Sequence, residues 1–220
     1  MNAFNIIGPI MVGPSSSHTG GAVRIGKIAY TLMDEQIKTA NITLYGSFAQ
    51  TYKGHGTDKA LVAGIMGMSP DDTGIRNSLD IAREKGLTIN INPNNQKTPH
   101  PNTVFVELVG INGERVSVMG SSVGGGNIVI TEINSMKVNI NCQNATFIIM
   151  HRDAPGAIAC ATKAIAEKGY NVSNIMVTRE KRGGNAVMTI EVDTGSIDKN
   201  IKGEIEKLNN MISCIILDRI

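Results

Sequence analysis

The chain has 220 residues, of which 41% are hydrophobic, so it is long enough for one large domain or two ordinary domains with a real core. Its net charge is +2, it has no Trp, and only 4% of its residues are aromatic, which argues against nucleic-acid modules that stack bases. It has no apolar run of the roughly 18–20 residues that span a membrane and no signal-peptide pattern, so we expect a cytoplasmic protein.

The segment Gly13–Gly21 reads Gly-Pro-Ser-Ser-Ser-His-Thr-Gly-Gly and runs into a predicted helix over 19–34, with Ser17 or His18 near its cap. Free backbone N–H groups at a helix start attract an anion, and histidine readily moves a proton near neutral pH. The segment therefore predicts a site for a small carboxylate or phosphate, with proton-transfer chemistry. The alternative is a Gly/Ser turn that caps a helix beside a solvated histidine.

The rest of the N-terminal part is predicted to be mixed α and β. A helix over 58–68 is capped by Thr57 or Asp58, and the acidic turn at Ser69-Pro70-Asp71-Asp72 begins a further helix that ends before Gly86. Asn112-Gly113 predicts a hairpin. We expect strands over 42–45, 87–91, 103–109, 115–119 and 128–133, and we place a domain boundary after residue 145.

The remaining residues, 146–220, predict the order βαββαβ of a ferredoxin-like unit. The expected strands cover 147–150, 172–179, 186–192 and 212–217, and the expected helices cover 157–168 and 197–209. This order, with Asp153-Ala154-Pro155-Gly156 opening the first helix, resembles an ACT domain. The resemblance implies pairing through sheets and a small ligand, often an amino acid, at an allosteric site with Asp153 and Gly156. The alternative is a module that only dimerises or packs.

Two of the four histidines share a context, since His18 and His55 each lie in a glycine-bearing segment before a predicted helix. A helix N-terminus disfavours imidazolium, which would keep each ring neutral and able to accept a proton. The two rings could therefore flank one pocket, although a lone loop histidine is usually only solvated. His100, between two prolines, suits a ligand-contacting turn or a plain loop, and His151 suits a structural or allosteric role.

A second glycine-rich segment, Gly120–Asn127, reads Gly-Ser-Ser-Val-Gly-Gly-Gly-Asn and predicts either an anion-binding loop or a simple turn. It matches neither a Walker A motif nor a dinucleotide fingerprint. The three cysteines, Cys142, Cys160 and Cys214, form no disulfide framework and no metal-binding motif. We expect all three to be buried free thiols, and we predict no metal ligands in this chain.

Taken in order, several motifs resemble the beta subunit of the iron–sulfur-dependent L-serine dehydratase over essentially the whole chain. They are Ile7-Gly8-Pro9, Gly13–Gly20, Gly54–Asp58, His100–Thr103 and Gly120–Gly126. The resemblance implies an α+β fold in which the N-terminal mixed α/β domain, 1–145, resembles the allosteric substrate-binding domain of phosphoglycerate dehydrogenase. An ACT domain over 146–220 follows it.

The family implies α,β-elimination of water from L-serine, giving pyruvate and ammonia. A [4Fe-4S] cluster held by the cysteines of a partner alpha subunit would act as the Lewis acid. His18 or His55 would be the catalytic base, and the substrate-binding residues would be Ser15, Ser16, Ser17, Thr19, His100, Asn102, Ser121 and Ser122. The expected partners are the alpha subunit, L-serine and a second copy of the chain through either domain, with no nucleic acid and no membrane.

Two other functions stay open. A non-catalytic, amino-acid-sensing regulatory subunit would bind serine or a phosphorylated ligand without turnover. A pyridoxal-phosphate dehydratase would use Ser122–Asn127 as its phosphate loop. The part of the chain before the ACT-like module is small for two lobes around that cofactor, and no lysine context marks a Schiff base.

Overall fold

The computed structural model describes residues 10–219, so the Ile7-Gly8-Pro9 part of the motif pattern lies outside the described residues. Contacts between Cα atoms divide the chain into two compact units, Met1–Asn134 and Ser135–Ile220. Strand β6 (Met136–Ile140) lies between this division and the boundary expected after residue 145, which stays a prediction. Within the described part of the chain, no helix has the length and apolar character that crossing a membrane requires.

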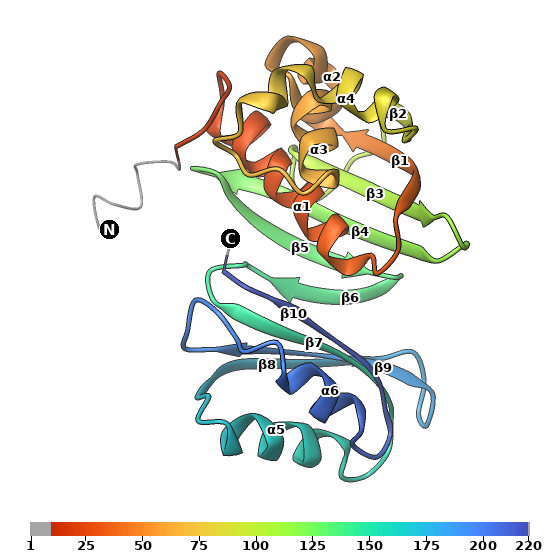
Figure 1. Ribbon diagram of the computed structural model, residues 1–220, viewed down its shortest axis with the longest axis vertical. Coiled ribbons are helices and arrows are strands. Elements are labelled where there is room, and N and C mark those ends of the chain that lie inside the picture. Colours follow the sequence, from red (N-terminus) through yellow and green to blue (C-terminus); the bar gives the residue numbers. More distant parts are fainter. Residues whose placement is uncertain (1–9, 220) are drawn as a thin grey trace. The chain divides into compact units, whose positions relative to one another are not determined.

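The first unit is built on a mixed sheet with the strand order β2-β1-β3-β4-β5 (Figure 1). β1 pairs with β2 in parallel, and the pairs β1–β3, β3–β4 and β4–β5 are antiparallel. The hairpin predicted at Asn112-Gly113 is confirmed, because it joins β3 to β4. The strands of the unit are β1 (Ile37–Tyr45), β2 (Thr88–Asn94), β3 (Thr103–Gly110), β4 (Arg115–Gly124) and β5 (Asn127–Ile133).

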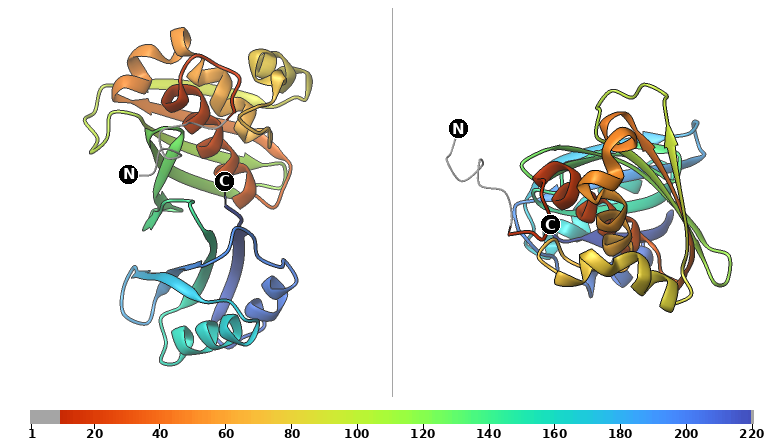
Figure 2. Two further views of the ribbon diagram at one scale, coloured as in Figure 1. Left: turned by 90° about the vertical axis from the view of Figure 1, so that its left-hand side faces the viewer. Right: turned by 90° about the horizontal axis from the view of Figure 1, so that it is seen from above.

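The helices of this unit lie over one face of its sheet (Figure 2). They are the π-helical turn η2 (Ser16–Gly20), α1 (Gly21–Leu32), α2 (Gly46–His55), α3 (Thr57–Ile65), the 3-10 turn η3 (Thr73–Asn77) and α4 (Ser78–Glu84). The predicted apolar face of α1 is confirmed, since it is buried at Ala22, Ile25, Ala29 and Leu32. Apolar side chains at helical spacing therefore place α1 against the sheet.

Helices α1 and α3 pack unusually closely because glycines face each other at the contact. A Cβ atom on Gly26 would collide with the backbone oxygen of Leu61, and one on Gly64 would collide with the backbone oxygen of Val23. Only residues without a side chain allow the two backbones to approach this far. The contact fixes α1 and α3 relative to each other. His18 lies in η2 directly before α1, and His55 ends α2 directly before α3.

Three local expectations in this unit are wrong. Neither Ser17 nor His18 caps α1: Ser15 caps η2, where its Oγ accepts a hydrogen bond from His18 N, and the cap of α1 is Gly20, with no side-chain hydrogen bond. The cap before α3 is Gly56 in the left-handed region, with no side-chain hydrogen bond, and not Thr57 or Asp58. The helix expected from Ser69 begins only at Ser78, because Asp72 first caps the separate turn η3.

Helix α2 was not predicted, and the second glycine-rich loop is mostly strand. Phe48 is the buried residue of α2, so its sequence carries almost no apolar periodicity to detect. β4 continues through Gly124, and the turn to β5 needs only the positive φ angles of Gly124, Gly125 and Gly126. Ser121 and Ser122 therefore lie on a strand and not in an anion-binding loop.

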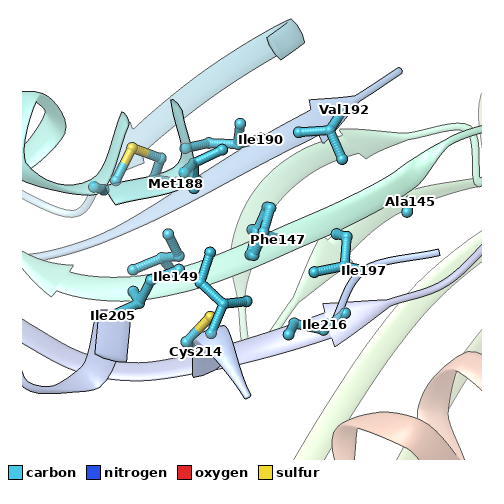
Figure 3. Close-up of a cluster of buried hydrophobic side chains, with 13 residues drawn as sticks. Ala145, Phe147, Ile149, Met188, Ile190, Val192, Ile197, Ile205, Cys214 and Ile216 are labelled. Atoms are coloured by element: carbon cyan, nitrogen blue, oxygen red, sulfur yellow. The ribbon is translucent and has the colours of Figure 1, made fainter. Parts of the chain in front are cut away.

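The second unit confirms the predicted order βαββαβ, with an antiparallel sheet in the order β10-β7-β9-β8 and both helices on one face (Figure 1). Its core joins side chains of the strands, such as Phe147 and Ile190, to Ile165, Ile201 and Ile205 of the helices (Figure 3). The elements are β7 (Ala145–Arg152), α5 (Ala157–Glu167), β8 (Val172–Arg179), β9 (Asn185–Val192), α6 (Ile201–Glu206) and β10 (Met211–Leu217).

Candidate functional site

His18 lies in η2, and hydroxyl groups contact both of its ring nitrogens. Ser47 Oγ is 3.0 Å from His18 Nε2, and Ser15 Oγ is 3.4 Å from His18 Nδ1. The ring also packs edge-on against Phe48, with 5.3 Å between the centroids. A hydroxyl can donate or accept, so these contacts hold the orientation of the ring in either neutral tautomer.

His55 completes a pair with His18, because the two ring centroids are 4.7 Å apart. Thr19 Oγ1 donates a hydrogen bond to the His55 backbone oxygen at 3.2 Å and so ties η2 to this residue. Within residues 10–219, the buried His55 Nδ1 has no hydrogen-bond partner. The expectation that His18 and His55 lie close together is consistent with this geometry, although their catalytic role stays a prediction.

The local setting of His55 differs from the expected loop. It is the last residue of α2, and Gly56, with φ 67°, turns the chain directly into α3. His55 therefore stands between the C-terminus of one helix and the N-terminus of the next. The N-terminus of α3 disfavours a positively charged imidazole, whereas the C-terminus of α2 favours one. The expectation that a helix N-terminus keeps His55 neutral therefore does not hold by itself.

The surroundings of His18 favour its neutral form. Partial burial lowers the pKa of His18 below its ordinary value of 6.5, and repulsion from the neighbouring His55 lowers the pKa further. A ring with a lowered pKa is unprotonated near pH 7. It can therefore accept a proton from a substrate that is placed within hydrogen-bond reach.

A cavity of about 380 Å³ opens beside His55. It is lined by residues 12–14, Thr19, His55, Gly56, Lys59, Ile75 and Arg76. The motif pattern predicted Thr19 and His55, but not Lys59 and Arg76. Isolated cations on helical segments carry no pattern that separates them from ordinary surface charges.

The other hydroxyls of the first motif lie in the same turn. Ser16 and Ser17 are half-buried in η2, and the backbone oxygen of Ser16 accepts a hydrogen bond from Gly21 N. Gly13 lies directly against the side chain of Thr19, with no room for a Cβ atom. The Gly13–Gly21 segment is thus folded compactly around His18 and Thr19.

A second group of predicted residues is joined by its own hydrogen bonds. Thr103 Oγ1 lies 2.8 Å from Ser121 Oγ and donates to the His100 backbone oxygen at 2.6 Å. Asn102 accepts from Ser122 N through its backbone oxygen at 2.9 Å. The structure therefore brings His100, Asn102, Ser121 and Ser122 together at the ends of β3 and β4.

Two contacts connect this second group to the histidine pair. Ser47 N donates to the Pro101 backbone oxygen at 2.8 Å, so the residue that contacts His18 also touches the His100–Asn102 turn. The Ser122 side chain lies where a Cβ atom on Gly21 would be, directly after η2. Both groups of predicted residues therefore belong to one region of the first unit.

In the second unit, Asp153 links the turn after β7 to the β8–β9 hairpin. Its Oδ2 atom accepts hydrogen bonds from Gly183 N and Arg179 Nη1, both at 3.0 Å. The Gly183 N–H group and then Arg179 lower the pKa of Asp153. Gly156, with φ 87°, caps α5. The allosteric role of Asp153 and Gly156 stays a prediction.

Two of the three cysteines are buried, as expected, and one is not. Cys142 and Cys214 are buried free thiols, and burial raises the pKa of Cys214 to about 12. Cys160 is exposed on α5, so the expectation that all three are buried is wrong for this residue. Over residues 10–219, no three side chains of His, Cys, Asp or Glu are grouped so that they could hold a metal ion.

Two family models match the chain. Residues 3–133 match the serine dehydratase beta chain model, and residues 147–213 match the AHAS small subunit-like ACT domain model. The second match confirms the ACT resemblance of the C-terminal unit.

Named relatives match most of the chain. A probable L-serine dehydratase beta chain of Bacillus subtilis is 40% identical over 96% of this chain and 95% of the relative. An L-serine dehydratase beta chain of Peptoniphilus asaccharolyticus is 37% identical over 87% of each chain. D-3-phosphoglycerate dehydrogenase of Bacillus subtilis is 23% identical over 90% of this chain and 37% of the relative, which agrees with the expected relationship to that enzyme.

Proposed function

This chain belongs to the serine dehydratase beta chain family, and from that premise we propose that it forms an L-serine dehydratase with an alpha subunit and supplies the proton-accepting group. In the proposed reaction, a base removes the Cα proton of L-serine, and the Cβ–O bond breaks with loss of water. The resulting aminoacrylate takes up water and gives pyruvate and ammonia. The enzyme would thus be an L-serine ammonia-lyase of amino-acid catabolism.

His18 is our candidate for the base. Its lowered pKa keeps it unprotonated near pH 7, and Ser47 and Ser15 hold its ring from both nitrogens. His55, whose ring centroid is 4.7 Å from that of His18, favours the neutral form of His18 by charge repulsion. This pair is the single observation that carries the proposal.

The hydroxyls and amides around the pair are the candidate substrate contacts. Ser16, Ser17 and Thr19 share the turn that holds His18. The second group, His100, Asn102, Ser121 and Ser122, adjoins the same turn through Ser47 and Gly21. Polar groups that converge on one region can fix the orientation of a small polar substrate.

The described residues of this chain do not fit a [4Fe-4S] cluster. Cys142, Cys160 and Cys214 are separate free thiols, and no metal-binding group occurs among residues 10–219. We therefore assign the ligands of any such cluster to the alpha subunit.

The second unit is proposed as the regulatory part. A small amino acid would bind at the turn that Asp153 holds and Gly156 caps, where a helix start offers backbone N–H groups. Self-association through either unit and a cytoplasmic location belong to the same proposal.

The test is pyruvate formation from L-serine under anaerobic conditions, with this chain alone and with a cluster-loaded alpha subunit. We expect turnover only in the mixture. A complex that forms and binds L-serine but makes no pyruvate would instead support the sensing alternative. Turnover by this chain alone would show that the partner is not needed.

A further inference from the structure

The cavity beside His55 is lined by positive charges that have no role in the reaction as proposed above. Among the described residues that line it, the charged side chains are Lys59 and Arg76, and neither Asp nor Glu is present. Across residues 10–219, neither cation forms an ion pair, whereas Arg83 and Arg115 of the same unit pair with Asp80 and Glu107. The cavity is therefore electropositive and suits an anion.

Hydrogen bonds hold the walls of this cavity together. The buried Ser78 Oγ donates to the Lys59 backbone oxygen at 2.7 Å, which joins the start of α4 to α3. Asp72 Oδ1 accepts from Gly74 N at 2.7 Å and so fixes η3, which carries Arg76. Val12 N donates to the Pro70 backbone oxygen at 2.8 Å and closes the third wall. These hydrogen bonds therefore fix the positions of the segments that carry Lys59 and Arg76.

We propose that Lys59 and Arg76 bind the carboxylate of the amino-acid substrate and so place its reacting carbon toward the histidine pair. The inference rests on the proposed function and adds the residues that recognise the anionic end of the substrate. A guanidinium group can donate two parallel hydrogen bonds to a carboxylate, and an ammonium group adds a point charge. His55 lines the same cavity, so bound substrate lies against one member of the pair.

Binding to the full chain tests this directly. The chain has four histidines, so the imidazole NMR signals of His55 can be followed during titration with L-serine, L-serinamide or inorganic phosphate. We expect L-serine to shift these signals and L-serinamide, which lacks the carboxylate, to leave them in place. Arg76→Gln and Lys59→Gln should each weaken L-serine binding roughly 10- to 100-fold, and Arg76→Lys, which keeps the charge but loses the paired hydrogen bonds, should restore only part of it.

Lys53→Gln is the matched control, because Lys53 is an exposed cation of α2 that does not line this cavity. Absence of L-serine binding, equal binding of L-serinamide, or an equal loss in Lys53→Gln would overturn the inference. Displacement of L-serine by equimolar phosphate would also overturn it, since the site would then accept any small anion.

Kinetics of the assembled enzyme separate this inference from the proposed function. Arg76→Gln should raise KM for L-serine roughly 10- to 100-fold, with a much smaller change in kcat, because the carboxylate is bound equally in the ground and transition states. Pyruvate formation with an unchanged KM in Arg76→Gln would contradict the inference alone. The expected binding pattern in a complex that makes no pyruvate would contradict the proposed function alone.

Discussion

At the scale of residues, the first motif predicts His18 and its nearest neighbours in sequence, but not the distant residues that hold the His18 ring in place. Ser15, His18 and Thr19 stand in one short segment with an unusual density of hydroxyls between glycines, so the sequence alone marks them. Ser47, which contacts His18 Nε2, lies 29 residues away in a helix without apolar periodicity. Its role depends on where α2 begins, and local sequence does not determine that position.

The link between the two rings gives a prediction about the pKa of His18. Replacing His55 with Asn removes the positive charge that disfavours protonation of His18, so the pKa of His18 should rise. It should still stay below 6.5, because burial is the larger cause and is unchanged. NMR titration of the His18 ring in the full chain measures this. An unchanged or lower pKa would contradict the proposed coupling.

The same lowered pKa predicts how stability depends on pH. Below pH 6.5 the unfolded chain binds a proton at His18 more readily than the folded chain does. The contribution of His18 to stability is therefore present above pH 6.5 and is lost as the pH falls through the lower, folded-state pKa. Urea unfolding at pH 5.5 and 7.5 should show a smaller pH difference for His18→Asn than for the unchanged chain. An equal difference would contradict this prediction.

At the scale of elements, apolar periodicity predicts α1, α3 and the strands, and turn residues predict the hairpins. α2 is not predicted because it lacks an apolar face. Contacts with other parts of the unit stabilise it instead, including the hydrogen bond from Ser47 N to the Pro101 backbone oxygen. The second glycine-rich segment turns the chain at Gly124–Gly126, as one of the two alternatives predicted, but its first residues lie in β4 because glycine in a strand can also serve close packing. Gly120, for example, leaves little room for a Cβ atom beside Ile25 and Ile130.

The close contact between α1 and α3 gives an element-scale prediction. Gly64→Ala places a methyl group against the backbone of α1, so we expect a loss of roughly 1–3 kcal/mol in the free energy of unfolding, measured with urea. Gly54→Ala in α2 is the matched control, because nothing lies within 4 Å of a Cβ atom there. That control should be neutral or stabilising by up to about 1 kcal/mol. Equal effects of the two substitutions would contradict the packing argument.

At the scale of the whole molecule, the predicted site residues fall into one unit and the predicted regulatory turn into the other. The predicted catalytic and substrate-binding residues, the first of which is Ser15 and the last Ser122, all lie before the division at Asn134. The predicted allosteric residues Asp153 and Gly156 lie after it. Element order predicted the ferredoxin-like unit almost completely. The mixed sheet of the first unit was not predicted as a topology, because pairing of β1 with both β2 and β3 depends on contacts distant in sequence.

The assembled enzyme tests the central claim, that His18 accepts the Cα proton of L-serine. The measurement is kcat for pyruvate formation at saturating L-serine, for complexes that contain the unchanged chain or His18→Asn. General-base catalysis contributes roughly 10²- to 10⁴-fold, so we predict a fall of at least about 100-fold with complex formation intact. A His18→Asn complex that keeps a kcat close to that of the unchanged enzyme would contradict the account.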